Sequence, residues 1–186
     1  MKAPTHIATA RLTLSPPLLS DAAAIFERYA SDPDVTRYLG WPRHQSVADT
    51  DSFLRFSAAE WEQRPAGPYL IRARSDDRLL GSTGLGFEGG HLTEAVTGYV
   101  LAKDSWGMGY ATEALRAMID VAQQIDVARL YALCHSEHRA SWRVLEKCGF
   151  AQDKSWTRQA EFPNLAPGVR QNVVCYALTV HRSYVA

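Results

Sequence analysis

Hydrophobic and polar positions along the chain follow two periods, one typical of strands and one typical of helices. Alternation around Leu12 and Leu14 indicates a strand, which Pro16 and Pro17 end. Further runs in the first half predict two helices and an antiparallel meander. The expected elements are a strand over residues 9–15, helices over 22–30 and about 46–64, a helical turn over 35–39, and strands over 69–74, 79–87 and 93–101.

The second half begins with a helix, because Leu115, Met118 and Ala122 recur at helical spacing as far as about Ile125. The pattern predicts an α/β (α+β) fold, a mixed and mostly antiparallel sheet of about seven strands flanked by about four helices. We expect a single domain over residues 1–186, with its core at about 10–180. The remaining expected elements are a strand over 129–134, a helix over 139–148, a strand from 150 onward and a final strand over 170–180.

Composition and charge exclude several classes of protein. Lys and Arg number 20 and Asp and Glu number 20, so the formal net charge is zero and a nucleic-acid partner is not expected. No apolar run approaches about 18 residues and the N-terminus lacks an apolar signal core, so we expect no membrane partner and a cytoplasmic location. Cys134, Cys148 and Cys175 lie in apolar contexts and are interpreted as reduced thiols, not disulfides or metal ligands.

A glycine turn joins the third meander strand to the long helix. Residues 106–114 read Trp-Gly-Met-Gly-Tyr-Ala-Thr-Glu-Ala, which presents backbone N–H groups at the positive end of a helix dipole and suits a phosphate. A dinucleotide fingerprint is disfavoured, because Thr112 stands where a third small residue belongs and no acid follows the next strand. A P-loop needs Gly-Lys-Ser/Thr, which is absent. A turn that merely starts a helix is the remaining alternative.

A second motif favours one ligand for this turn. Residues 141–150 read Ser-Trp-Arg-Val-Leu-Glu-Lys-Cys-Gly-Phe. Together the two motifs resemble the GNAT superfamily of acyl-CoA-dependent N-acetyltransferases, and within it the RimJ/RimL-like subgroup. The resemblance extends over roughly residues 10–180 and includes Arg11–Leu14, Asp32–Leu39 and Gly98–Leu101.

The resemblance implies the GNAT fold and an enzyme that uses acetyl-CoA as cosubstrate without a metal. The turn would bind the CoA pyrophosphate, and the pantetheine arm would lie where strand 99–101 splays from strand 131–134. An amine, either a protein N-terminus or a small molecule, would attack the thioester directly in a monomer or homodimer. The implied cofactor-binding residues are Tyr99, Val100, Leu101, Trp106, Gly107, Met108, Gly109, Tyr110, Ala111, Thr112, His138 and Ser141.

Three positions depart from the superfamily pattern. Asp104 stands where Arg or Gln usually opens the turn, and His138 replaces an Asn that usually binds the cofactor arm. Leu145 replaces the Tyr that often protonates the leaving sulfur, so Ser141 is the best candidate for that acid. Members of the superfamily often carry a Glu where Val96 stands, so Glu94, two residues earlier on the same strand face, is the candidate general base, and a solvated strand-end charge is the alternative. A backbone N–H of residue 100 or 101 is expected to hold the oxyanion.

Several other side chains are possible members of the site. His91, His135 and His138 titrate near neutral pH and flank it, whereas Glu113 is interpreted as a helix-end charge. A non-catalytic acyl-CoA-binding sensor is the alternative to an enzyme. The candidate lining of an acceptor pocket is Trp41, Phe53, Trp61 and Phe87.

Overall fold

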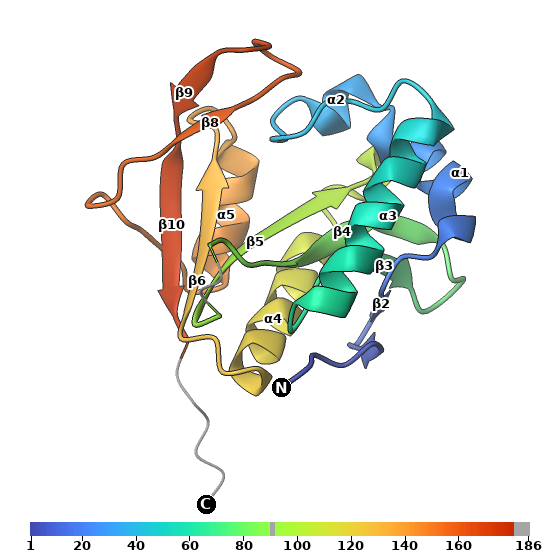
Figure 1. Ribbon diagram of the computed structural model, residues 1–186, viewed down its shortest axis with the longest axis horizontal. Coiled ribbons are helices and arrows are strands. Elements are labelled where there is room, and N and C mark those ends of the chain that lie inside the picture. The colour runs from blue at the N-terminus through green and yellow to red at the C-terminus, as the bar shows by residue number, and fades with distance from the viewer. Residues whose placement is uncertain (90–91, 181–186) are drawn as a thin grey trace, which may run out of the picture.

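The computed structural model describes residues 1–89 and 92–180, and its centre is an eight-stranded sheet in the order β1-β2-β3-β4-β5-β6-β10-β7 (Figure 1). All neighbouring strands are antiparallel except β5 and β6, which are parallel. The strands are β1 (Ile7–Ala8), β2 (Leu12–Ser15), β3 (Pro68–Ala73), β4 (Leu79–Gly86), β5 (Glu94–Leu101), β6 (Arg129–Cys134), β7 (Ala151–Gln152) and β10 (Val174–Thr179), with β8 (Gln159–Glu161) and β9 (Arg170–Asn172) in a separate two-stranded ribbon.

Helices cover both faces of the sheet, and side-chain caps fix where two of them begin. Asp32 accepts hydrogen bonds from the first turn of α2, and Ser46 forms a capping box with Asp49 at the start of α3. No helix in the described ranges is long and apolar enough to cross a membrane. The α-helices described are α1 (Ala22–Ile25), which continues as a π-helical turn to Ala30, α2 (Pro33–Thr36), α3 (Val47–Gln63), α4 (Tyr110–Gln124) and α5 (Arg139–Lys147).

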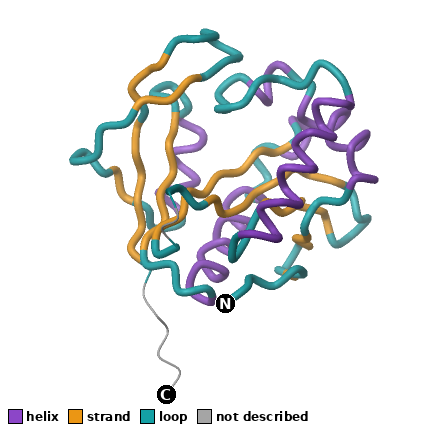
Figure 2. Tube along the Cα trace, in the orientation of Figure 1, coloured by secondary structure: helices purple, strands orange, loops and turns teal. Residues whose placement is uncertain are grey.

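Strand alternation divides the core into two clusters, one on each face of the sheet. Leu80 and Leu101 belong to the cluster under α4, whereas their neighbours Leu79 and Val100 belong to the cluster with α1 and α3. Figure 2 shows the helices lying against the strands, with loops gathered at the end of the sheet above β5 and β6. The sheet is therefore buried on both sides, and strand ends and loops are left to form a site.

The predicted fold is confirmed, with differences at short elements. The expected helix over 22–30 is one α-turn followed by a π-turn, and the expected turn over 35–39 begins earlier, at Pro33. The strand expected over 170–180 is broken at Val173, whose N–H donates to Arg158 O and so ties the ribbon to the sheet. The strand expected from 150 onward pairs over only two residues. These breaks follow from tertiary contacts that local periodicity does not encode.

Candidate active site

The parallel strands β5 and β6 pair only at their first residues. Their register runs from Glu94 opposite Arg129 to Val96 opposite Tyr131, and no pairing follows. Beyond that point β5 continues along β4 and β6 continues along β10, so the strands diverge, as Figure 1 shows. The predicted splay between strands 99–101 and 131–134 is therefore present.

Backbone donors of β5 face this opening. The N–H of Ala102 donates to Leu80 O at 2.7 Å, on the β4 side. Because N–H groups alternate sides along a strand, that of Val100 also points toward β4, and those of Tyr99 and Leu101 point into the opening. Of the two candidate oxyanion donors, Leu101 is the one directed toward the gap.

Two cavities meet at the opening. One, of about 440 Å³, extends to the glycine turn and is lined there by Trp106, Gly107 and Ala111. The other, of about 490 Å³, reaches Trp41 and Phe162. Their shared lining residues are Tyr38, Leu39, Tyr99, Val100, His138 and Ser141.

The glycine turn presents unpaired donors. Gly107 and Gly109 have φ of 75° and 80°, a left-handed conformation that glycine adopts without strain. The backbone N–H groups of residues 107–112 have no hydrogen-bond partner within the described chain, and Glu113 N–H is the first to bond back, to Gly109 O. The turn and the first turn of α4 thus form a cluster of free N–H groups suited to an anion.

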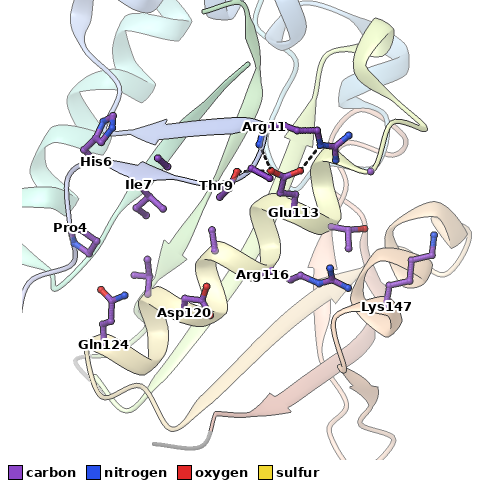
Figure 3. A pocket seen from close by; sticks show the side chains of 16 residues that line it. Pro4, His6, Ile7, Thr9, Arg11, Glu113, Arg116, Asp120, Gln124 and Lys147 are labelled. Carbon is purple, nitrogen blue, oxygen red and sulfur yellow. Dashed lines mark hydrogen bonds and ion pairs between the residues drawn. The ribbon is translucent and has the colours of Figure 1, made fainter. Parts of the chain in front are cut away.

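Arg11 and Glu113 hold the glycine turn in place through hydrogen bonds. Glu113 accepts from Thr9 Oγ1 at 2.6 Å, from Arg11 N at 2.8 Å and from Arg11 Nε at 2.7 Å (Figure 3). Arg11 Nη1 in turn donates to Met108 O at 2.9 Å. Burial alone would raise the pKa of Glu113, but the hydrogen bonds from Thr9 and Arg11 outweigh it and lower that pKa. The Glu113 carboxylate is therefore charged and has a structural role.

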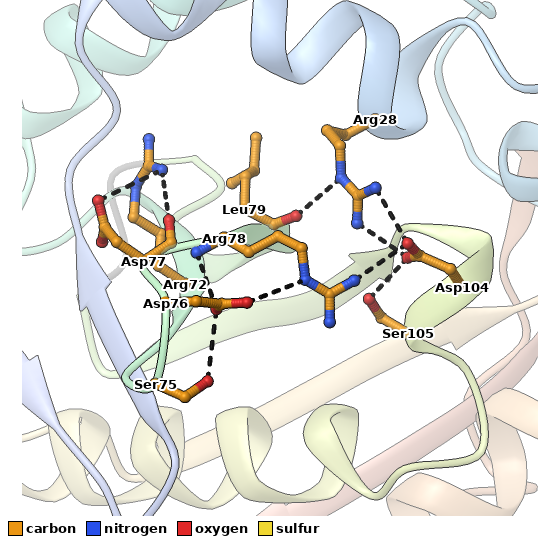
Figure 4. A network of polar contacts seen from close by, with 9 residues as sticks. All are labelled: Arg28, Arg72, Ser75, Asp76, Asp77, Arg78, Leu79, Asp104 and Ser105. Atoms are coloured by element: carbon orange, nitrogen blue, oxygen red, sulfur yellow. Dashed lines mark hydrogen bonds and ion pairs between the residues drawn. The ribbon is translucent and has the colours of Figure 1, made fainter.

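Asp104 is neutralised and faces away from the turn. Its carboxylate accepts from Arg28 Nη1 and Nη2 at 3.0 and 2.8 Å, and from Arg78 Nη1 at 3.0 Å (Figure 4). The hydrogen bonds from Arg28 hold the pKa of Asp104 below its ordinary value. A departure that looks unfavourable beside a phosphate is thus compensated by two arginines from other elements.

Ser141 lies where the two cavities join. Tyr99 Oη donates to Ser141 O at 2.9 Å and lies 3.0 Å from Ser141 Oγ, and Cys134 Sγ lies 3.5 Å from the same hydroxyl. Burial raises the pKa of Tyr99 and raises that of the Cys134 thiol to about 11. Both groups therefore remain protonated at neutral pH and act as hydrogen-bonding groups.

Two histidines flank the ring of Tyr38. Its centroid lies 5.0 Å from that of His135 and 4.8 Å from that of His138, with both pairs stacked. His135 Nδ1 accepts from Glu137 N, so its Nε2 carries the proton and donates to Gln171 Oε1. His138 lines both cavities, and burial, with a smaller effect of His135, lowers its pKa below 6.5. A neutral imidazole thus faces the junction.

The family model for the acetyltransferase (GNAT) domain matches residues 11–151, most of the chain. The chain belongs to the GNAT acetyltransferase family. It is 28% identical over 160 residues to the uncharacterised N-acetyltransferase YoaA of Bacillus subtilis, covering 86% of this chain and 89% of YoaA. The family prediction is therefore confirmed.

Solved GNAT structures share the fold. RimL, the ribosomal L7/L12 α-N-protein acetyltransferase, in complex with a CoA–cysteine disulfide, superposes with a TM-score of 0.80 at 20% identity, over 96% of this chain and 97% of that one. The microcin C7 self-immunity acetyltransferase MccE, in complex with acetyl-CoA and AMP, gives 0.81 at 21% identity, over 95% and 97%. These likenesses establish the GNAT fold.

Most of the predicted site residues of this GNAT domain lie together. The predicted residues of the turn, of β5 and of α5 border the free N–H cluster, the opening between β5 and β6, or the junction of the two cavities. Trp106 is held in place by a hydrogen bond from its Nε1 to Leu101 O at 2.8 Å. The fold does not place Glu94 next to Ser141. It begins β5, lines neither cavity, and its carboxylate lies 3.6 Å from Arg129 Nη1.

The acceptor-pocket candidates are mostly elsewhere. Trp41 lines the 490 Å³ cavity, whereas Phe53, Trp61 and Phe87 pack in the core clusters. His91 lies outside the described residues. Sequence reasoning missed Tyr38 and Asn164, whose roles depend on contacts between distant segments; only the position of Tyr38 within a family motif was a signal.

A larger groove, of about 930 Å³, lies beside α4 on the other side of the turn (Figure 3). Glu113, Arg116 and Asp120 line it from α4, and Lys147 lines it from the end of α5. It borders Gly109 and Thr112 but not Ser141, so its size does not make it the reaction site.

Proposed function

We propose that this GNAT acetyltransferase binds acetyl-CoA across the opening between β5 and β6 and transfers the acetyl group directly to a primary amine. The observation that carries the proposal is the continuity of the two cavities through Tyr99, His138 and Ser141. One cavity begins at free N–H groups suited to a pyrophosphate, and the other offers room for an acceptor on the far side of the junction.

The cosubstrate would occupy the turn-side cavity. Its pyrophosphate accepts from the N–H groups of residues 107–112, and its amide-bearing arm adds to the free edge of β5 like a short strand. Tyr99 and Leu101, whose N–H groups face the opening, supply the donors along that edge. The thioester then lies at Ser141, between the cavities.

Transfer needs no covalent intermediate on the protein. The amine nitrogen forms a bond to the thioester carbon, an oxyanion develops beside a β5 N–H such as that of Leu101, and the carbon–sulfur bond then breaks. Ser141 Oγ donates a hydrogen bond to the departing sulfur. Cys134 is protonated at neutral pH and does not serve as a nucleophile.

His138 is the proposed proton acceptor, in place of Glu94. It lines both cavities and is neutral near pH 7, whereas Glu94 lines neither and pairs with Arg129. Among the described residues none is hydrogen-bonded to the His138 imidazole, whose ring stacks on that of Tyr38. The proton lost by the attacking amine therefore has an acceptor at the junction.

Two measurements test this function. Acetyl-CoA at about 100 times its dissociation constant is expected to stabilise the protein by about 2.7 kcal/mol in thermal unfolding, with no such effect from NAD. Release of CoA thiol is then followed over a panel of amines and N-terminal peptides. No stabilisation by acetyl-CoA or CoA would contradict the binding proposal. Stabilisation without thiol release above background hydrolysis would favour the acyl-CoA sensor instead.

A further inference from the structure

The cavity on the acceptor side carries no formal charge. Within the described chain, none of the residues that line it is Asp, Glu, Lys or Arg. Its two threonine hydroxyls are already used, since Thr83 Oγ1 donates to Gly98 O at 2.8 Å and Thr97 Oγ1 donates to Gly84 O at 3.0 Å. Few polar groups are therefore left to solvate a charged or amide-rich ligand.

Aromatic rings from two segments far apart in the sequence line the same cavity. Tyr38 and Trp41 lie in the loop between α2 and α3, and Phe162 follows β8. Each ring is held by another aromatic group, Trp41 at 5.2 Å from His44 and Phe162 edge-on at 4.8 Å from His135. Such rings present flat apolar surface at low entropic cost, which suits an apolar or aromatic ligand body.

Asn164 fixes the two walls of this cavity relative to each other. Its Nδ2 donates to Thr36 O at 2.7 Å and to Trp41 O at 2.9 Å, and its Oδ1 accepts from Arg43 N at 2.7 Å. These bonds join the loop between β8 and β9 directly to the loop after α2. The cavity is thus preformed by three hydrogen bonds from one side chain and does not depend on a ligand to assemble it.

Gly98 sets the depth of the cavity. A Cβ built on Gly98 meets no atom within 4 Å, and its backbone is not in the left-handed region, so a side chain fits there without strain. That side chain would project into space lined by Val96 and Val100, the residues on the same strand face. The absence of a side chain leaves the room beside the junction open.

We propose that the acceptor is a small primary monoamine with an aromatic or bulky apolar body and no second charge, bound between Tyr38, Trp41 and Phe162. The inference rests on the proposed acetyl transfer and specifies its acceptor. A carboxylate, phosphate or second ammonium would lose its water without gaining a partner in this cavity. A peptide acceptor would also bring backbone amides that need hydrogen bonds, and the free edge of β5 beside this cavity is the one that the cosubstrate arm would occupy.

The test compares matched amines in the thiol-release assay. 2-Phenylethylamine and phenylalanine share one body and differ by a carboxylate, and putrescine and a serine-starting hexapeptide serve as charged and peptidic alternatives. We expect kcat/KM for 2-phenylethylamine to exceed the other three values by at least about tenfold, because a charge or amide that enters the cavity without a hydrogen-bonding partner weakens binding of the transition state.

A variant locates the preference in the cavity. Gly98→Leu is expected to raise KM for 2-phenylethylamine at least about tenfold while leaving acetyl-CoA stabilisation unchanged, and Ala151→Leu on exposed β7 is the size-matched control. Phenylalanine, putrescine or the peptide acetylated as fast as 2-phenylethylamine would overturn the acceptor proposal alone. Acetyl-CoA binding with no amine acetylated would overturn the transferase proposal and the acceptor proposal with it.

Discussion

At the scale of single residues, Tyr99, Cys134 and Ser141 meet where β5 and β6 separate. Burial keeps the Tyr99 hydroxyl and the Cys134 thiol protonated at neutral pH, so the Ser141 hydroxyl is surrounded by neutral hydrogen-bonding groups. A charge on any of the three would be costly there. The cluster therefore suits a hydroxyl that supports a leaving sulfur and leaves proton removal to another group.

We propose that this group is His138, and its substitution has a predicted pH signature. The ring of His138 stacks on Tyr38, Ser141 lines the same two cavities, and burial, with a smaller effect of His135, lowers the pKa of His138 from its ordinary value. Because only neutral imidazole accepts a proton, kcat/KM of the unaltered protein should fall as pH drops through that pKa. His138→Asn, which keeps a hydrogen-bonding side chain, should lower kcat about 100-fold and abolish this acidic limb.

Acetyl-CoA stabilisation in thermal unfolding separates this role from a purely structural one. His138→Asn should retain it, because Asn is the residue that the resemblance places on the cofactor arm. If His138→Asn is as active as the unaltered protein and keeps the same acidic limb of the pH profile, His138 does not accept the proton.

At the scale of elements, the turn before α4 has the geometry of a preorganised anion site. Gly107 and Gly109 adopt left-handed conformations, and the Arg11–Glu113 pair holds the turn through Met108 O. A Cβ on Gly107 would meet no protein atom within 4 Å, so the space beside it is open to a ligand. The backbone, and not a basic side chain, thus provides the donors.

Gly107→Ala tests this role against a control with the same backbone strain. Gly168 has φ of 74° and equally open surroundings, but it lies between β8 and β9, far along the chain from the turn. Each alanine should lower the free energy of unfolding by about 1–2 kcal/mol. Thermal unfolding with acetyl-CoA should show the stabilisation lost in Gly107→Ala and kept in Gly168→Ala. Equal stabilisation in both variants would exclude phosphate binding at the turn.

The turn and its helix could be predicted because their signal is local. The glycines, the apolar stripe of α4 and the short helix α5 are contiguous in sequence, so periodicity and motif spacing were sufficient. Hydrogen bonds join Arg11 to Glu113 and Asn164 to Thr36, and each pair is more than 100 positions apart in the sequence. No local pattern encodes such contacts. Glu94 illustrates the same limit, because its strand was predicted but the distance from Glu94 to the opening depends on where the pairing of β5 and β6 ends.

At the scale of the whole molecule, the sheet is buried on both faces and opens only where two parallel strands diverge. Charged residues that directly follow β5 are paired, with Asp104 between Arg28 and Arg78 and with Lys103 bound to Asp34. The protein with zero net charge therefore combines these ion pairs with an acceptor-side cavity that has no charged lining residue. This arrangement favours a site that binds one anion by backbone amides and excludes charge from the acceptor cavity.

The central claim is that acetyl-CoA lies across the opening between β5 and β6. The most direct test is a crystal structure of the protein grown with CoA or acetyl-CoA. We predict pyrophosphate oxygens at hydrogen-bonding distance from N–H groups of residues 107–112 and the arm beside Tyr99 and Leu101, with the sulfur next to Ser141. A CoA molecule bound in the large groove along Arg116 and Asp120, with the opening between β5 and β6 vacant, would contradict the claim.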